Sequence, residues 1–186
     1  LYERLMYDPN LRTLPWSRTH LWIVDERCVP FDHEKSNFRQ IRDIIVDHSG
    51  IPAEQVHPMA AMLPDAAERY ERELREHLGW REKGQDRLDF VLLGMGDDGH
   101  TASLFPGHDA LDERDRLVVK CVGPKVTPPD RITMTYPLIN AARLVAVMVC
   151  GANKVKTVER VARQLDDRHT LPILGVRPLA GELKWY

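Results

Sequence analysis

Cysteine is scarce in this chain of 186 residues and unevenly spaced. The three cysteines are Cys28, Cys121 and Cys150, and no two of them form a CxxC spacing. An odd number of cysteines so far apart argues against a closed disulfide framework and against a thiolate metal cage, so reducing conditions are the simpler interpretation. We expect Cys28 to be an inert, buried thiol rather than a nucleophile.

Long hydrophobic runs and an excess of one charge sign are also absent. The longest apolar run, residues 144–150, has the length of a strand and is too short to span a bilayer. The formal net charge is −2, which gives no general reason to expect nucleic acid or an anionic membrane as a partner. Any anion site must therefore be local. With no internal repeat or linker, residues 1–186 are expected to form a single domain.

What the chain does have is an alternation of strand-length apolar runs with amphipathic segments. The expected strands are 20–26, 88–96, 117–122, 144–149 and a last one ending near Trp185, and the expected helices are 36–48, 66–80 and 154–165. Residues 1–12 resemble the end of a helix that Pro9 and Asn10 close. The alternation predicts an α/β fold with a largely parallel sheet flanked by helices. Such sheets bind ligands at the carboxyl ends of their strands.

The clearest candidate for chemistry is the segment GMGDDGHTASLFPG, residues 94–107. Its glycines follow a predicted strand and permit tight turns and close approach to a ligand. A histidine there, His100, is suited to removing a proton from water, since imidazole titrates near neutral pH. A nearby carboxylate such as Asp98 would fix the tautomer and stabilise the imidazolium.

Other interpretations of this segment stay open at this point. The aspartates of a glycine turn often only bond their own backbone. A metal site built from Asp97, Asp98, His100 and His108 fits no familiar ligand spacing, so we expect no metal. Thr101 and Ser103 are candidates to cap a short helix that follows.

Charged residues in three further segments are candidates for binding an anion. Arg27, in the DER segment that follows the first strand, has the geometry to bind a phosphate or carboxylate or to stabilise developing negative charge. Arg131, and Lys154 at the opening of a helix, would suit a sugar phosphate. The alternatives are a local ion pair at Arg27 and solvated surface charges at the other two. Ser36 is expected to be a helix N-cap.

Together these segments resemble one known family. The string GMGDDGHTASLFPG and the patterns DERxVPxxxxxSN and PPxRITxTxPxIN, in this order, resemble the 6-phosphogluconolactonases, and so do GxxK at residues 151–154 and the closing GxLxWY. The resemblance implies a Rossmann-like domain that hydrolyses 6-phosphoglucono-1,5-lactone to 6-phosphogluconate in the pentose phosphate pathway, without metal or cofactor. It implies a cytoplasmic location.

The resemblance also implies roles for individual residues. It makes His100 the general base, Asp98 the aspartate of the glycine turn and Arg27 the arginine of the DER segment. Positive residues facing the substrate phosphate correspond to Arg131 and Lys154. Apart from the resemblance, we expect Gly96 and Gly99 to contribute to substrate binding through the backbone amides of the glycine turn.

The chain departs from the family pattern at both ends. The family's first strand and its glycine-serine-threonine-proline phosphate loop have no counterpart here, and neither has the aspartate that often follows the closing tryptophan. We therefore expect a truncated stretch of a longer protein. The segment 19–30 also resembles the lactonase half of bifunctional hexose-6-phosphate dehydrogenases, so fusion to, or work beside, a glucose-6-phosphate dehydrogenase is one expectation.

Two rival functions remain compatible with the sequence. The same superfamily contains sugar-phosphate isomerases and deaminases, which share a GxDGH turn, although the residues after His100 favour the lactonase. A sugar-phosphate sensor without turnover is the second rival. Retention of both His100 and Asp98 argues against it, since a sensor needs only the phosphate clamp.

Overall fold

Parallel strands with helices on either side make up the main body of the protein. The computed structural model describes residues 1–9, 14–79, 87–124 and 126–186. The helices are α1 Tyr2–Tyr7, α2 Asn37–Ile41, α3 Asp47–Ser49, α4 Ala66–Leu78, α5 Tyr136–Ile139 and α6 Val155–Arg163. The strands are β1 Leu21–Trp22, β2 Asp25–Arg27, β3 Val56–His57, β4 Phe90–Gly94, β5 Val118–Val122, β6 Asp130–Met134, β7 Leu144–Met148 and β8 Glu182–Trp185.

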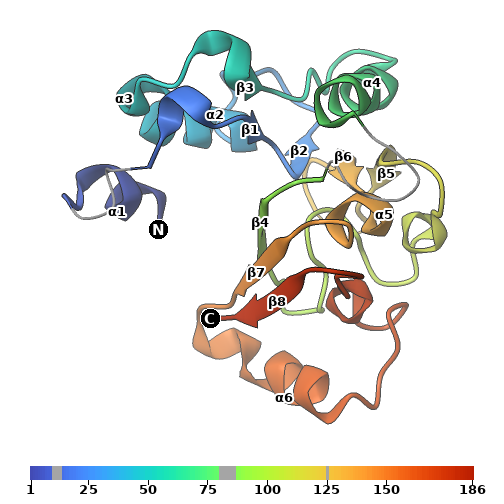
Figure 1. Cartoon of the computed structure of the whole chain (residues 1–186). Helices are drawn as coiled ribbons and strands as arrows, with labels where there is room; N and C mark the ends of the chain where they lie inside the picture. Colours follow the sequence, from blue (N-terminus) through green and yellow to red (C-terminus); the bar gives the residue numbers. More distant parts are fainter. Residues whose placement is uncertain (10–13, 80–86, 125) are drawn as a thin grey trace.

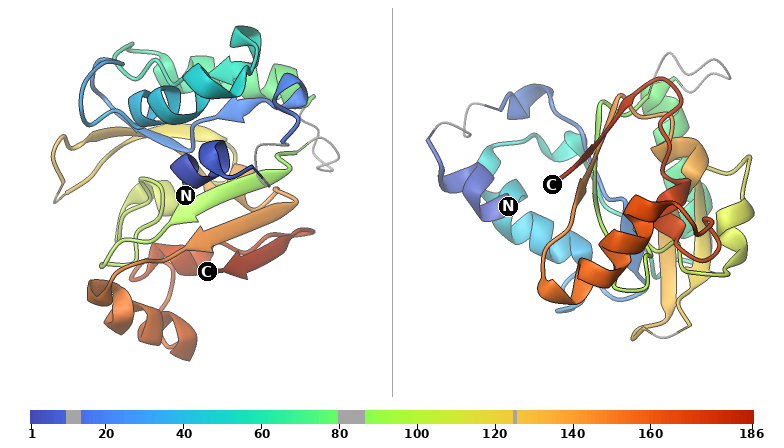
Figure 2. Two further views of the ribbon diagram at one scale, coloured as in Figure 1. Left: turned by 90° about the vertical axis from the view of Figure 1, so that its left-hand side faces the viewer. Right: turned by 90° about the horizontal axis from the view of Figure 1, so that it is seen from below.

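The strands pair in two different ways. β4, β7 and β8 form a parallel sheet in the order β4-β7-β8, and β1 pairs with β3 in parallel. α2 and α6 lie on opposite sides of the β4-β7-β8 sheet (Figures 1 and 2). The predicted α/β architecture of parallel sheets flanked by helices is confirmed. The structure adds a sheet in the order β2-β6-β5 whose pairings are antiparallel.

The first predicted strand, residues 20–26, divides between two sheets. β1 pairs with β3, whereas β2 pairs with β6, so the chain changes partners between Trp22 and Asp25. A continuous apolar run cannot reveal that change, because both halves are partly or fully buried. The change of partner places the DER segment at the edge of a different sheet from the residues just before it.

The predicted helices are confirmed, with one difference in form. Ser36 caps α2 by accepting a hydrogen bond from the backbone N–H of Arg39 at 3.1 Å. The helical segment then widens into a π-helix over Arg42–Val46 and continues as α3. α4 ends at Leu78, before Gly79. Trp80, the last residue of that predicted helix, and Asn10, which was expected to close the first one, lie outside the described residues. No helix in the described part is both long and apolar enough to cross a membrane.

The core is apolar and continuous between the two larger sheets. Val91 and Leu93 of β4, Val145 and Val147 of β7 and Ile132 of β6 are all at most 3% exposed. Burying one side chain of this size contributes about 1.5–3 kcal/mol. This packing fixes the carboxyl end of β4, from which the glycine turn projects.

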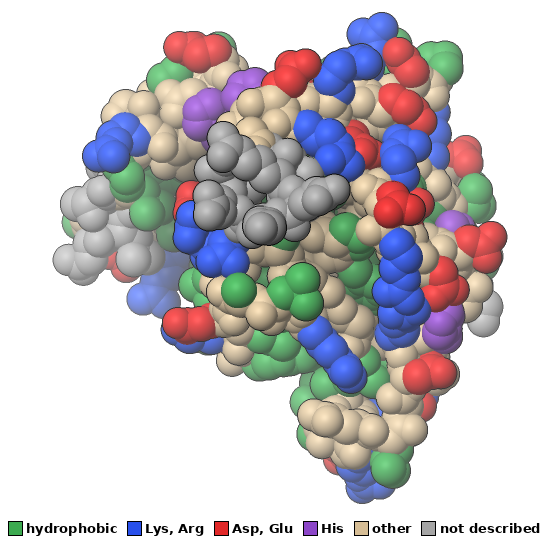
Figure 3. All heavy atoms as spheres, turned by 45° about the vertical axis from the view of Figure 1, so that its right-hand side comes forward, with side chains coloured by type: hydrophobic (Ala, Val, Ile, Leu, Met, Phe, Trp, Pro, Cys, Tyr) green, Lys and Arg blue, Asp and Glu red, His purple; other side chains and the backbone are tan. Residues whose placement is uncertain are grey.

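Outside the core, the surface carries both charge signs. On the face shown in Figure 3, lysine and arginine side chains are interspersed with aspartate and glutamate.

The three thiols are unpaired, and Cys28 is half-buried. Burial raises the pKa of the Cys28 thiol, which makes the reactive thiolate scarcer at neutral pH.

Candidate functional site

A cavity of about 320 Å³ opens where β2, β4 and the start of α6 come together. Its lining includes four of the predicted catalytic and substrate-binding residues: Arg27, Gly96, His100 and Lys154. Asp98 lies beside His100, whereas Arg131 and Gly99 are not part of the lining. The carboxyl end of β4 contributes to the wall, at the edge where parallel sheets bind their ligands.

His100 and Asp98 form a hydrogen-bonded pair. The Nδ1 atom of His100 lies 2.6 Å from Oδ1 of Asp98, which also accepts a bond from the backbone N–H of His100 at 3.0 Å. A carboxylate only accepts, so Nδ1 carries the proton and Nε2 is left with its lone pair. Asp98 thus bonds its own turn and orients the imidazole at the same time. The His100 side chain is 29% exposed, so it is accessible to water.

The pKa of Asp98 is lowered overall. Burial acts to raise it, but the hydrogen bond from the His100 backbone and the interaction with the His100 ring outweigh that effect. The carboxylate therefore stays ionised over the range in which an imidazole accepts a proton. An ionised Asp98 stabilises an imidazolium at position 100.

Two glycines of the turn have no room for a side chain. A Cβ on Gly96 would lie 2.1 Å from Nδ1 of His100 and 2.7 Å from Oδ1 of Asp98. Gly99 has a φ of +81°, and a Cβ there would meet Leu171 at 2.6 Å. Gly96 thus makes space for the histidine-aspartate pair, whereas Gly99 makes space for packing behind the turn.

Asp25 is a cavity residue that sequence reasoning did not select. Its Oδ2 accepts a bond from Ser103 Oγ at 2.7 Å, and its backbone oxygen accepts one from Asn37 Nδ2 at 2.7 Å. Burial raises the pKa of its carboxyl, against the lowering effects of Ser103 and Arg27. Its position directly after a strand, next to Arg27, was the available signal.

Glu26 is not part of the cavity lining and holds α2 in place. Its carboxylate accepts bonds from Ser36 Oγ and from the backbone N–H groups of Arg27, Asn37 and Phe38, at 2.8–2.9 Å. An anion at a helix N-terminus satisfies amides that lack helical partners. Glu26 is 1% exposed, so these bonds join β2 firmly to the helix that supplies Asn37.

Arg27 and Arg131 lie directly opposite each other on β2 and β6. Like charges in this position are destabilising unless an anion offsets them. Arg27 donates from Nη1 to the backbone oxygen of Lys35 at 2.7 Å, and Arg131 is only 6% exposed. Within the described residues, the Nε atoms of both side chains are buried without a hydrogen-bond partner. The pKa of Arg131 is lowered, first by burial and then by Arg27.

The helix that begins after Lys154 is joined to the glycine turn. Thr157, on α6, donates from Oγ1 to the backbone oxygen of Asp97 at 2.5 Å. Gly151 adopts a φ of +106° just before the 3-10 turn that contains Lys154. These contacts hold the start of α6, and with it Lys154, at the cavity wall.

The expectation that Thr101 and Ser103 cap a following helix is wrong. The first helical turn after them begins only at Asp109, with His108 as its N-cap. Thr101 instead donates from Oγ1 to the backbone oxygen of Gly94 at 2.8 Å, and Ser103 donates to Asp25. Both hydroxyls therefore stabilise the cavity wall.

A histidine-aspartate pair on a glycine turn, in a cavity that Arg27 also lines at the carboxyl end of a parallel sheet, defines the class as α/β proteins with a ligand-binding cavity at that edge. Residues 1–185 match the family described as glucosamine-6-phosphate isomerases/6-phosphogluconolactonase. The chain belongs to this family.

Individual relatives agree with the assignment. The chain is 42% identical over 188 residues to a 6-phosphogluconolactonase of Nostoc sp., covering 100% of this chain and 75% of the relative. It is 39% identical over 180 residues to the human GDH/6PGL endoplasmic bifunctional protein, covering 92% of this chain and 22% of that protein. A probable chloroplastic 6-phosphogluconolactonase 4 of Oryza sativa is 37% identical over 196 residues, covering 99% of this chain and 60% of the relative.

Solved structures show the same fold. The 6-phosphogluconolactonase of Thermotoga maritima superposes with a TM-score of 0.82 at 32% identity, covering 99% of this chain and 78% of that one. The 6-phosphogluconolactonase of Trypanosoma brucei superposes with a TM-score of 0.81 at 28% identity, covering 99% and 77%. The chain therefore spans most of the length of these two solved structures. It spans only about a fifth of the length of the human relative and three fifths of the length of the Oryza sativa relative.

Proposed function

We propose that this protein hydrolyses 6-phospho-D-glucono-1,5-lactone to 6-phosphogluconate, with His100 as the general base. The observation that carries the proposal is the bond between His100 Nδ1 and Asp98, on the wall of a cavity that also contains Arg27 and Lys154. It puts a base with a free Nε2 beside two cations. The 6-phosphogluconolactonases of Nostoc sp. and Thermotoga maritima support the choice of substrate.

The chemical step needs only water and one proton carrier. His100 Nε2 removes a proton from water as the water oxygen bonds to the lactone carbonyl carbon, and the carbonyl oxygen takes up the electron pair. When the carbonyl reforms, the bond to the ring oxygen breaks, and that oxygen takes the proton from the imidazolium. The carboxylic acid product then ionises, so each turnover releases one proton.

The remaining residues have electrostatic and positioning roles. Asp98 keeps the His100 ring oriented and stabilises its charged form. The Arg27 guanidinium, which lines the cavity, stabilises the oxyanion, since the backbone N–H groups of Gly96 and Gly99 already donate to the backbone oxygens of His100 and Gly96. Lys154, which also lines the cavity, binds the phosphate and thereby positions the carbonyl. Arg131 adds positive charge behind Arg27, and Gly99 shapes the turn.

The setting of the reaction is also part of the proposal. The chain aligns with only 22% of the human bifunctional protein, and that relationship supports work beside, or fusion to, a glucose-6-phosphate dehydrogenase. We propose a cytoplasmic location, although relatives include chloroplastic and endoplasmic proteins.

The test is lactone hydrolysis above the spontaneous rate. Fresh lactone is generated in situ, and its decay is followed by proton release in a weakly buffered solution, with and without the protein. Since general-base assistance is worth about 100- to 10,000-fold, His100→Ala is expected to lose acceleration by that factor, mostly in kcat. His48→Ala, which removes an exposed histidine outside the cavity, should behave like the unmodified protein.

Two outcomes would contradict the proposed reaction, and a third would contradict the proposed base. A folded protein that binds 6-phosphogluconate but leaves the lactone decay unchanged would be a sensor. Turnover of an aldose phosphate or amino-sugar phosphate in place of the lactone would make the protein an isomerase or deaminase. Full activity in His100→Ala would leave the reaction in place but remove His100 as its base.

A further inference from the structure

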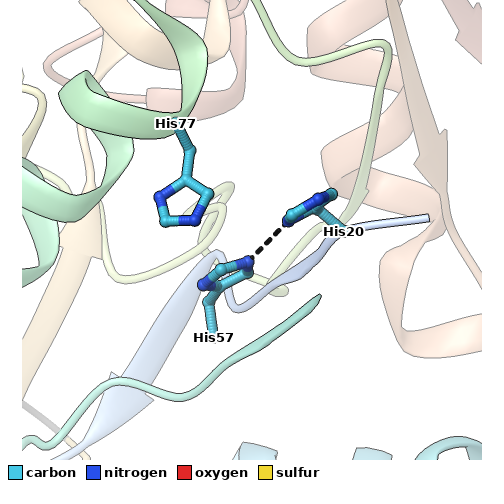
Figure 4. Close-up of side chains that lie close together, drawn as sticks. All are labelled: His20, His57 and His77. Atoms are coloured by element: carbon cyan, nitrogen blue, oxygen red, sulfur yellow. Dashed lines mark hydrogen bonds between the residues drawn. The ribbon is translucent and has the colours of Figure 1, made fainter. Parts of the chain in front are cut away.

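Three histidines from separate parts of the chain come together outside the cavity. His20 directly precedes β1, His57 ends β3 and His77 lies in the last turn of α4 (Figure 4). One ring nitrogen from each lies within 4.8 Å of the other two, a clustering of ligand-type side chains found once in the described part of the chain. None of the three lines the cavity. His57 is buried, whereas His20 and His77 are exposed.

Hydrogen bonds define which nitrogens are available. His57 Nδ1 lies 2.5 Å from the Glu73 carboxylate, and His77 Nδ1 lies 3.0 Å from the Glu73 backbone oxygen. Both partners can only accept, so both Nδ1 atoms carry protons and both Nε2 atoms present lone pairs. His20 Nδ1 lies 2.9 Å from His57 Nε2 and donates to it. The carboxylate behind His57 and the carbonyl behind His77 form the arrangement that metal-binding histidines use to fix their tautomer.

The surroundings hold the buried histidine rigidly. The Trp22 ring stacks on His57 with centroids 3.7 Å apart and an interplanar angle of 5°. The Tyr70 hydroxyl, on α4, accepts a bond from the backbone N–H of Ile23 at 2.7 Å and lies 3.2 Å from the backbone oxygen of His57. These contacts join β1, β3 and α4 around the cluster, so the ligands converge without a change of backbone.

We propose that His20, His57 and His77 form a binding site for a divalent transition-metal ion of the zinc type. Imidazole nitrogens are suitable ligands for zinc, copper and nickel. A tetrahedral zinc ion holds its ligand nitrogens about 2.0–2.1 Å from the metal, which places the nitrogens about 3.3 Å from one another. The spacing of 2.9 to 4.8 Å reaches this value through small ring rotations. His57 Nε2, His77 Nε2 and His20 Nδ1 are the ligands, and water takes the fourth position at the exposed side.

Binding requires His20 to change tautomer, which moves one proton within the ring and releases none. His20 Nδ1 gives up its proton, and the ring takes its other neutral tautomer with the proton on the exposed Nε2. The ion then connects β1, β3 and α4, which are far apart in sequence. Because an unfolded chain does not hold these ligands together, zinc stabilises the folded state by mass action.

The experiment uses metal-free protein and zinc alone as the probe. Calorimetric titration is expected to give one zinc per chain at this site, and saturating zinc is expected to raise Tm. His20→Ala and His77→Ala each remove one exposed ligand and should abolish both effects, while circular dichroism verifies that the variants are folded. His48→Ala, which removes an exposed histidine elsewhere, should retain both effects, and so should His100→Ala, which tests the cavity as an alternative zinc site.

A second pair of variants separates a metal site from a merely structural histidine cluster. Glu73→Gln weakens the partner of His57 without removing a ligand and is expected to lower zinc affinity about 10- to 100-fold. Glu76→Gln, at an exposed position on the same helix, should leave the affinity unchanged. The proposal is overturned if zinc neither binds the unmodified protein nor raises its Tm. It is equally overturned if the Tm rise persists in full in both histidine variants.

Discussion

Gly96 offers the sharpest test of the proposed catalytic geometry. Replacing it with alanine puts a Cβ where Nδ1 of His100 would be 2.1 Å away and Cε1 2.3 Å away. Contacts below 3.0 Å are essentially never tolerated by a Cβ, so the ring must retreat. The change is confined to the side chains of the turn, because the backbone of Gly96 does not adopt a positive φ.

The size of the effect follows from the displacement. The ring has to move by about 0.9 Å, and a misplacement near 1 Å costs about 100-fold in rate when a reacting group is involved. The same movement breaks the 2.6 Å bond to Asp98 or pulls Asp98 with it, since the new Cβ also lies 2.7 Å from Asp98 Oδ1. We therefore expect Gly96→Ala to lower kcat for lactone hydrolysis about 100-fold, with a smaller change in KM.

The assay compares two alanine substitutions on the same cavity wall. Gly94, at the end of β4, also lines the cavity, but a Cβ there meets nothing within 4 Å. Gly94→Ala should therefore lose much less kcat than Gly96→Ala. Thermal unfolding of both variants verifies that they are folded. Equal kcat values in Gly96→Ala and the unmodified protein would refute the role of the His100–Asp98 pair.

Three further predictions concern charge and stability. Glu26→Gln leaves fewer acceptor sites for four buried or half-buried donors and should cost about 1–3 kcal/mol of unfolding free energy in urea titrations. A change below the error of that measurement would contradict the helix-anchoring role. Lys154→Gln should raise KM for the lactone more than it lowers kcat, and steady-state kinetics with an unchanged KM would remove Lys154 from the phosphate site. Burial lowers the pKa of His57 below its unfolded value, so the folded state binds fewer protons than the unfolded one. Stability should therefore be full above about pH 6.5 and fall as the pH drops towards the folded pKa, and urea unfolding at pH 7.5 and 5.5 should show a smaller loss in His57→Phe.

Local patterns in the sequence determined the elements of the fold. The run 88–96 predicts β4 because its strand length and apolar character are local properties, and the glycines after it predict the turn that carries His100. The Asp98–His100 pairing was predictable because two residues of separation in a glycine turn place both side chains on one loop. Ser36 was predictable as a cap because capping depends on the residues of a single helical turn.

Contacts between distant segments were decided only by the tertiary structure. The change of partner between β1 and β2, the position of Arg27 opposite Arg131 and the bond from Ser103 to Asp25 each join residues that no local pattern relates. Ser103 therefore looked like a helix cap in the sequence, although its hydroxyl is used by a residue 78 positions away. His20, His57 and His77 have no shared spacing, and only the packing of α4 on β1 and β3 brings their rings together, since long-range packing depends on which surfaces the whole chain buries.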